Sequence, residues 1–351
     1  MSRAALLPCL CDPYILKGWL HLYKTVWKNE VDNLYVLLQG YLEVPIMKEC
    51  ERLVEEAGGI SFLQMGSMMQ HGDGIRFLLE NCTEDHVVLL EDDAWIIRPG
   101  ALDEQFKIIE TGKTDIIGST RTSCSPEIIA RCVAMFDLNG ESPEHPISVC
   151  PNLWPNFLFA KRDDLLATDR NFNANSWKKG EVLELLGDYV CKEDCGSDTF
   201  VWASIQLRAM KKRFMYAHQR HCSSDDLKRD GLLRVENLPW VHFGSLSSLM
   251  NPGSGLLRDS KHVPIGGQSR NVPNEHYDKY DIPTGREVVR RLSIASNFLE
   301  SFPLEGGKFA YFNQIYNDSL KDSLDRFHLN DVQFDEFKKI YKELLPQLFG
   351  D

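Results

Sequence analysis

Three consecutive carboxylates follow an apolar segment in the first third of the chain. Residues 86–90 read His-Val-Val-Leu-Leu, and Glu91, Asp92 and Asp93 follow directly. Adjacent carboxylates repel one another, so they cannot all be buried without a cation. Oxygen ligands suit Mg²⁺ or Mn²⁺, above all beside a phosphate. An acidic pair after a strand is usually a turn that closes the strand, but three acids after a buried apolar run favour a metal site.

The acidic run needs elements that place it where a ligand can bind. The first 120 residues alternate between short apolar runs and segments of helical periodicity. We expect strands over 4–11, 34–38, 60–65 and 86–90, and helices over 14–27, 45–56 and 74–81. This alternation predicts an α/β fold with a mostly parallel sheet and helices on both faces. Ligands of such sheets bind beyond the carboxyl ends of the strands, where the acidic run would lie.

The rest of the chain is more mixed. We expect strands over 115–118, 156–160 and 213–217, and helices over 181–189 and 198–210. Segment 251–284 is rich in Gly, Pro, Ser and charge, without periodicity, which is typical of a binding loop or lid. A capping box at Thr284 and Glu287 and an amphipathic pattern over 331–348 predict helices beyond it. The expected organisation is an α/β domain over 1–250, a flexible loop or lid over 251–284 and a helical extension over 285–351.

The balance of charge disfavours some classes of partner. The chain has 351 residues, with 39 Lys and Arg against 51 Asp and Glu, which gives a formal net charge of −12. Nucleic acids and membranes attract basic proteins, so nonspecific binding to either is disfavoured. No stretch approaches the roughly 18 apolar residues that a membrane helix needs, and the apolar start is too short for a signal peptide. We therefore expect a cytoplasmic protein without a membrane span.

The ten cysteines are scattered along the chain. In a cytoplasmic protein of this size we expect reduced thiols rather than a disulfide framework. Cys191 and Cys195, together with His218, His221 and Cys222, form a group that could hold zinc. Neither spacing matches a known zinc finger well, so the sequence favours plain thiols there.

The acidic run and its approach resemble the nucleotide-sugar-dependent glycosyltransferases of the GT-A fold, a Rossmann-like architecture. The family's signature is an Asp-x-Asp-type motif at the end of the fourth strand, and Glu91-Asp92-Asp93 looks like its Glu-Asp-Asp variant. Segment Gly72–Asn81 is similar to the glycine-opened helix that leads into that motif. The resemblance implies that Asp93 binds the Mn²⁺ or Mg²⁺ that bridges the donor diphosphate, and that Asp92 and Glu91 contact the ribose or the water shell of the metal. Arg76 on that helix could reach the donor, although a surface arginine usually meets water.

The resemblance also implies a catalytic base. Trp154–Asp163 looks like the strand and turn that shape the acceptor side, and Glu193–Trp202 looks like the start of a helix beneath the acceptor. In inverting members an acidic residue there is the general base. A carboxylate at a helix N-terminus is held by backbone N–H groups and by the helix dipole. Asp198 fits that place best and Asp194 is the runner-up, while the plainer alternative is an acid that only caps the helix.

Further residues are implied near the donor. Many GT-A enzymes have a late histidine that completes metal coordination ahead of a closing loop, and His242 is placed in that way. Arg258 and Lys261 in the loop that follows could meet the diphosphate or could simply be solvated. The second strand ends without the acidic residue that many members use for the nucleotide base, so Asp12, at the end of the first strand, takes that place.

The expected function is therefore that of a metal-dependent glycosyltransferase, a hexosyl- or pentosyltransferase. It would move a sugar from a nucleotide-diphosphate donor to an acceptor hydroxyl with inversion, Asp198 being the base. Two alternatives remain open: a nucleotidyltransferase of a related fold, although the sequence lacks a phosphate loop of the Walker kind, and a noncatalytic nucleotide-sugar-binding protein. The acceptor is left open among a glycan, a lipid-linked sugar, a protein and a modified nucleic-acid base.

Overall fold

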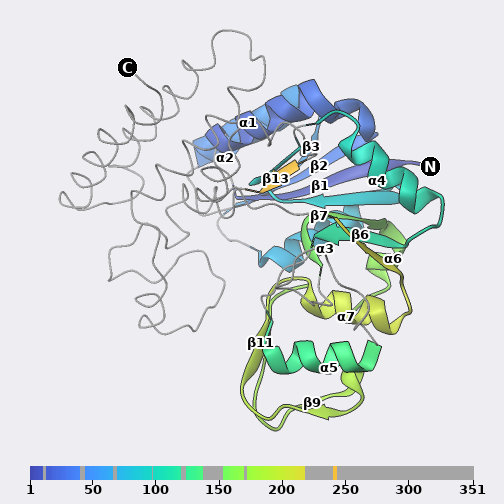
Figure 1. Ribbon diagram of the computed structural model, residues 1–351. Helices are drawn as coiled ribbons and strands as arrows, with labels where there is room; N and C mark the ends of the chain where they lie inside the picture. Colours follow the sequence, from blue (N-terminus) through green and yellow to red (C-terminus); the bar gives the residue numbers. More distant parts are fainter. Residues whose placement is uncertain are drawn as a thin grey trace, which may run out of the picture.

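The centre of the molecule is a seven-stranded sheet in the order β12-β6-β7-β4-β1-β2-β3 (Figure 1). The computed structural model describes residues 1–10, 13–39, 44–65, 69–96, 98–119, 124–136, 153–169, 172–217 and 240–242. The strands of the sheet are β1 (Arg3–Leu10), β2 (Asn33–Gln39), β3 (Ile60–Gln64), β4 (His86–Leu90), β6 (Ile116–Ser119), β7 (Trp154–Lys161) and β12 (Phe214–Tyr216). Neighbours are parallel except where β7 meets β4 and β6. The prediction of a mostly parallel, Rossmann-like sheet is confirmed.

Helices cover both faces of this sheet, as predicted. One hydrophobic cluster joins the strands to α1 (Pro13–Leu22), α2 (Val44–Ala57) and α4 (Ala101–Glu110). The other joins them to α3 (His71–Asn81), α6 (Arg162–Leu166) and α7 (Val201–Ala209). Along β4, Val88 and Leu90 belong to the first cluster, whereas Val87 and Leu89 belong to the second. A strand buried on both faces has to be apolar throughout, which is why the sequence predicts its bounds correctly.

Short elements surround the main sheet. A π-helical turn, η1 (Tyr23–Trp27), and a 3₁₀ turn, η2 (Lys28–Glu30), continue from α1 towards β2. Two three-residue strands, β5 (Ala94–Ile96) and β13 (Trp240–His242), pair antiparallel with each other. β5 comes directly after the acidic residues 91–93, so this small ribbon lies beside the predicted site.

A smaller group of elements lies below the sheet in Figure 1, around α5 (Pro126–Phe136). It contains two antiparallel ribbons, β8 (Asn175–Trp177) with β11 (Cys195–Ser197) and β9 (Val182–Leu183) with β10 (Tyr189–Val190), and the 3₁₀ turn η4 (Glu184–Leu186). We call these elements the side lobe. A third hydrophobic cluster fills it, made of Ile128, Cys132, Leu183, Leu186, Cys191, Cys195, Val201 and Ile205. Because α7 contributes to this cluster and to the sheet, it joins the side lobe to the main fold.

The helix predicted over 181–189 is wrong. The segment contains β9, η4 and β10 instead, and Val182 pairs with Val190 across the ribbon. Gly187 and Asp188 both have left-handed backbone conformations, with φ of 69° and 56°. Two such residues in a row reverse the chain, which ends the helical turn after Leu186.

The helix predicted over 198–210 is correct in kind but begins later, at Val201. Phe200 precedes it with φ of 70°, a left-handed conformation, and its ring is fully buried. Asp198 therefore lies in the turn that follows β11 rather than within the first turn of the helix. Phe200, Val201 and Ile205 are all buried, as the sequence predicts.

Several sequence predictions lie outside the described residues. These are the loop or lid over 251–284, the helical extension over 285–351, and the side chains of Asp12, Arg258 and Lys261. Across the part of the chain that the structure describes, no helix has the length and apolar character that crossing a membrane requires.

Candidate functional site

The acidic residues 91–93 form the turn that joins β4 to β5, and we call it the acidic turn. Its backbone is fixed by two buried indoles. Trp95 Nε1 donates to the carbonyl of Asp92 at 3.0 Å, and Trp19 Nε1 donates to the carbonyl of Ala94 at 3.0 Å. The turn therefore has a defined shape that is set by side chains from β5 and α1.

The carboxylates of the acidic turn lie mostly below the surface. Asp92 and Asp93 are 6% and 4% exposed, and the side chain of Glu91 is 13% exposed. Trp154 Nε1, at the start of β7, donates to Glu91 Oε1 at 2.8 Å, and His71 Nε2, at the start of α3, lies 3.7 Å from the same oxygen. Three consecutive acids with so little access to water favour the binding of a cation, because a cation offsets their mutual repulsion.

Pairing of β13 with β5 brings a distant segment to the acidic turn. His242 lies opposite Ala94, the residue directly after Asp93, and Trp240 lies opposite Ile96. Trp240 is buried and stacks on Phe157 of β7, with ring centroids 4.5 Å apart at an interplanar angle of 11°. The backbone register therefore places His242 at the acidic turn, where the sequence predicts a metal-completing histidine.

Close packing fixes the N-terminus of α3, which carries His71. A Cβ at Gly72 would lie 2.3 Å from the carbonyl carbon of Phe172, so only glycine fits there. Asp73 and Asn173 hold the same turn by two reciprocal hydrogen bonds, Asp73 N–H to Asn173 Oδ1 at 3.1 Å and Asn173 Nδ2 to Asp73 Oδ1 at 2.8 Å. The glycine-opened helix thus has a steric reason for its first glycine.

Sequence reasoning did not identify His71 or Trp154 as neighbours of Glu91. His71 stands directly before the predicted glycine-opened segment, and Trp154 opens the strand assigned to the acceptor side. Neither position carries a local signal for contact with the acidic turn. The contact arises from the antiparallel pairing of β7 with β4, in which Phe157 lies opposite Leu90.

The two candidate bases have different surroundings. Asp194 is exposed, and Lys178 Nζ at 2.9 Å and the Lys179 N–H at 2.9 Å both donate to it. The backbone hydrogen bond from Lys179 and the Lys178 ammonium lower the pKa of the Asp194 carboxyl. Asp198 is half-buried, and its Oδ1 accepts the N–H of Thr199 at 2.8 Å.

Arg76 lies on α3, and its guanidinium contacts its own helix, the end of α6 and the segment that follows α6. It donates to Glu80 at 2.8 Å and to the carbonyl of Leu166 at 3.3 Å, and it lies over the ring of Phe172 at 5.9 Å. These contacts tie α3 to α6 and to the segment that follows α6. They give Arg76 a packing role that the sequence did not indicate.

No protein-family model matches this chain, and a search of curated proteins found no match either. Solved structures do show similarity. Glucosyl-3-phosphoglycerate synthase from Mycobacterium tuberculosis in complex with phosphoglyceric acid aligns with a TM-score of 0.34 and 17% identity, over 47% of this chain and 58% of that chain. A mycobacterial protein aligns with a TM-score of 0.34 and 18% identity, over 47% of this chain and 54% of that one.

The same synthase in complex with Mn²⁺, uridine diphosphate and glucosyl-3-phosphoglycerate aligns over more of this chain. The TM-score is 0.38 at 15% identity, over 65% of this chain and 75% of that chain. Since the first of these matches spans 58% of the other protein's length and all three TM-scores are low, the function has to be inferred from this chain's own site.

Proposed function

We propose that this protein is a metal-dependent glycosyltransferase that moves a sugar from a nucleotide-diphosphate donor to an acceptor hydroxyl. The observation that carries the proposal is the acidic turn at the carboxyl end of β4, with Asp92 and Asp93 nearly buried. Because β13 pairs with β5, His242 lies opposite Ala94, the residue that follows Asp93. Carboxylate oxygens suit Mn²⁺ or Mg²⁺, and one imidazole shifts the preference towards Mn²⁺.

Each residue of the acidic turn has a proposed role. Asp93 and His242 would hold the metal, while Asp92 and Glu91 would contact the ribose or the water shell of the metal. When bound, the cation would offset the negative charge of the departing nucleotide diphosphate. Trp154 and His71 orient Glu91 by contacting its Oε1.

Asp198 is the proposed base on the acceptor side. A base must accept the proton of the attacking hydroxyl, so its carboxylate must be ionised and within reach of the acceptor. Asp194 fits poorly, because Lys178 and Lys179 lower the pKa of its carboxyl. A single carboxylate in that position would lead to one displacement and to inversion at the anomeric carbon.

Other donor contacts remain predictions from the sequence. Asp12, Arg258 and Lys261 lie outside the described side chains. Arg76 is held by Glu80 and Leu166, so it would have to exchange those partners to reach the donor.

A binding experiment with Asp93→Asn tests the metal site. Calorimetry with uridine and guanosine diphosphates, with and without Mn²⁺, should show metal-dependent binding in the wild type and a loss of at least about 10-fold in the variant. The fold should persist, because the carboxylate lies in a turn and contributes little to the hydrophobic core. Unchanged Mn²⁺-dependent binding in Asp93→Asn would overturn the assignment.

The matched control is Asp85→Asn, at the opposite end of β4. Asp85 is exposed, directly precedes β4 and accepts hydrogen bonds from Ser2, so the change removes a carboxylate at the end of the strand away from the acidic turn. Nucleotide binding should stay at the wild-type level. Incubation with a panel of sugar nucleotides, and separately with nucleoside triphosphates and sugar phosphates, then separates the functions. Release of nucleoside diphosphate from the sugar nucleotides supports transfer, and release of pyrophosphate from the triphosphates supports nucleotidyl transfer. Binding without turnover supports a noncatalytic protein.

A further inference from the structure

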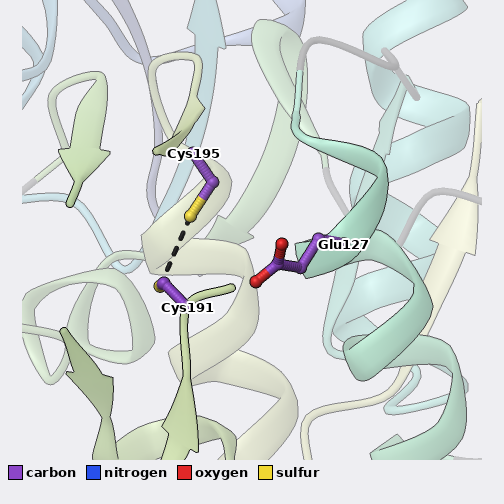
Figure 2. Close-up of side chains that lie close together, drawn as sticks. All are labelled: Glu127, Cys191 and Cys195. Atoms are coloured by element: carbon purple, nitrogen blue, oxygen red, sulfur yellow. Dashed lines mark hydrogen bonds between the residues drawn. The ribbon is translucent and has the colours of Figure 1, made fainter. Parts of the chain in front are cut away.

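A second group of potential metal ligands lies in the side lobe, away from the acidic turn along the chain. Cys191 follows β10 and Cys195 begins β11, and Glu127 comes from the first turn of α5. The two sulfurs lie 3.4 Å apart, and the three potential ligand atoms all lie within 4.8 Å of one another. In Figure 2 the carboxylate of Glu127 extends towards the cysteine pair.

Backbone hydrogen bonds fix the position of Cys191. Its N–H donates to the carbonyl of Glu181 at 2.9 Å, and its carbonyl accepts from the N–H of Gly180 at 2.8 Å. The side chain is 1% exposed. The first sulfur is therefore buried and held on a short closed loop.

The other two groups are held as firmly. Cys195 pairs with Trp177 in the ribbon of β11 and β8, and it is 6% exposed. Glu127 Oε1 accepts the N–H of Lys192 at 2.8 Å, which aims the carboxylate at the loop between the cysteines. Two sulfurs and a carboxylate oxygen are thus brought together by three separate segments of backbone.

We propose that Glu127, Cys191 and Cys195 bind one Zn²⁺ ion, which joins α5 to the loop between β10 and β11. Zinc with thiolate and carboxylate ligands is tetrahedral, with Zn–S distances of about 2.3 Å, so its two sulfurs lie about 3.8 Å apart. The observed separation of 3.4 Å needs an opening of only a few tenths of an ångström. A disulfide, in contrast, would need the sulfurs to close to about 2.05 Å.

The binding step balances in charge and protons. Two thiols each lose a proton to solvent, and the two thiolates and the carboxylate then coordinate the ion, with water in the fourth position. Soft thiolates select zinc over Mg²⁺ and Mn²⁺, which prefer oxygen. This site would therefore take a different metal from the carboxylates of the acidic turn.

The sequence favours plain thiols here for a clear reason. A Cys-x-x-x-Cys spacing matches no familiar zinc finger, and the third ligand lies far upstream on another element. His218, His221 and Cys222, which the sequence offered as partners, lie outside the described residues. Only the packing of α5 against the loop reveals Glu127 as a ligand.

Zinc binding by the full chain tests the proposal. Protein freed of metal by a chelator under reducing conditions, then given Zn²⁺ in the presence of excess Mg²⁺, should bind one equivalent, measured by elemental analysis and by competition with a chromogenic zinc indicator. The double variant Cys191→Ala/Cys195→Ala should lose more than about 100-fold in affinity, and Glu127→Gln about 10- to 100-fold. Zinc should also raise the Tm of the wild type but not that of the double variant.

The matched control is Cys50→Ala, which removes an equally buried thiol on α2. It should bind zinc as the wild type does. If the double variant fails to fold, Co²⁺ added to the wild type should give thiolate-to-cobalt charge-transfer absorption, which Glu127→Gln should alter. A wild type that binds no zinc, a double variant that binds it equally well, or a cobalt complex without thiolate absorption would overturn the proposal.

Discussion

Asp198 and Asp194 offer the same chemical group four residues apart, yet their surroundings suit them to different tasks. Asp194 is fixed by a lysine ammonium and a backbone N–H on the exposed edge of the side lobe. Asp198 is half-buried in the turn before α7, and its Oδ1 accepts the backbone N–H of Thr199.

Substitution of Asp198 tests the proposed base. Asp198→Asn should lower the rate of sugar transfer by about 10²–10⁴-fold, because the attacking hydroxyl has a pKa far above neutrality. Donor affinity should change little, since the residue is assigned to the acceptor side. Steady-state kinetics with a sugar nucleotide identified by the panel would measure both quantities.

Asp194→Asn is the comparison for that experiment and should have a mild effect on the rate of transfer, because Asp194 is exposed and already paired with Lys178. NMR coupling constants of the product report the anomeric configuration. An active Asp198→Asn enzyme, or a product with retained configuration, would show that Asp198 is a structural residue of the turn.

The candidate acids of the acidic turn are easier to select from the sequence than the residues that contact them. Three carboxylates after an apolar strand form a local pattern, so Glu91–Asp93 could be singled out without a structure. The contacts of Glu91 with Trp154 and His71 depend on strand pairing and on the packing of α3, which no local pattern encodes. Glu127 beside the cysteine pair was missed for the same reason.

At the scale of elements, the N-terminus of α3 is held by an unusually close approach of two backbone segments. Its N-terminus lies against the backbone at Phe172 and supplies His71 to the acidic turn. The two glycines of its first turn differ in the space around them. A Cβ at Gly72 would meet backbone atoms at 2.3–2.4 Å, whereas a Cβ at Gly74 would meet the Leu37 side chain at 3.1 Å.

Two alanine substitutions exploit this difference. Gly72→Ala should destabilise the protein by roughly 1–3 kcal/mol, because the backbone it meets cannot yield without moving α3. Gly74→Ala should be close to neutral, because the gain in helix propensity, about 1 kcal/mol, offsets a small rearrangement of Leu37. Urea unfolding of both variants measures the difference, and equal free energies of unfolding would contradict the proposed close approach.

The elements themselves were predictable to different degrees. The bounds of β4 follow from an unbroken apolar run, and α2 and α3 follow from helical periodicity and glycine signals. The segment 181–189 was misassigned because its apolar spacing suits a helix, while the left-handed pair Gly187 and Asp188 reverses the chain. The pairing of β13 with β5 joins segments far apart in sequence, so neither segment by itself indicates its partner.

At the scale of the whole molecule, the two proposed metal sites differ in chemistry and in place. The acidic turn lies at the carboxyl edge of the main sheet and offers oxygen ligands, whereas the side lobe offers two buried sulfurs and one carboxylate. Oxygen ligands favour Mn²⁺ or Mg²⁺ and thiolates favour Zn²⁺, so the two sites can select different cations even if their geometries are similar. α7 packs against both the sheet and the side lobe, so zinc in the lobe would stabilise the element that follows Asp198.

The stability of the whole fold should depend on pH through a partly buried ion-pair group between the start of β1 and α4. Arg3 of β1 contacts two acids of α4. It donates two hydrogen bonds to Glu110, each of 2.8 Å, and one of 2.8 Å to Asp103. Its guanidinium also lies over the ring of Phe106. Hydrogen bonds from Arg3 lower the pKa of the Glu110 carboxyl, and those from Lys107 and then Arg3 lower the pKa of the Asp103 carboxyl.

Arg3→Met should therefore cost about 2 kcal/mol at neutral pH, the range for hydrogen bonds between charged groups that are shielded from water. A carboxyl whose pKa is lower in the folded state stabilises the fold fully above its unfolded pKa and loses that contribution as the pH falls through the folded pKa. The difference between wild type and variant should hence be constant above about pH 5 and shrink below it. Arg213→Met is the control, since Arg213 pairs with Asp115 but is 58% exposed, and its loss should cost less than the loss of Arg3 because water screens an exposed ion pair. Denaturant unfolding from about pH 3 to 7 measures both differences, and a cost for Arg3→Met that stays constant down to the lowest pH would contradict the role of the two carboxylates.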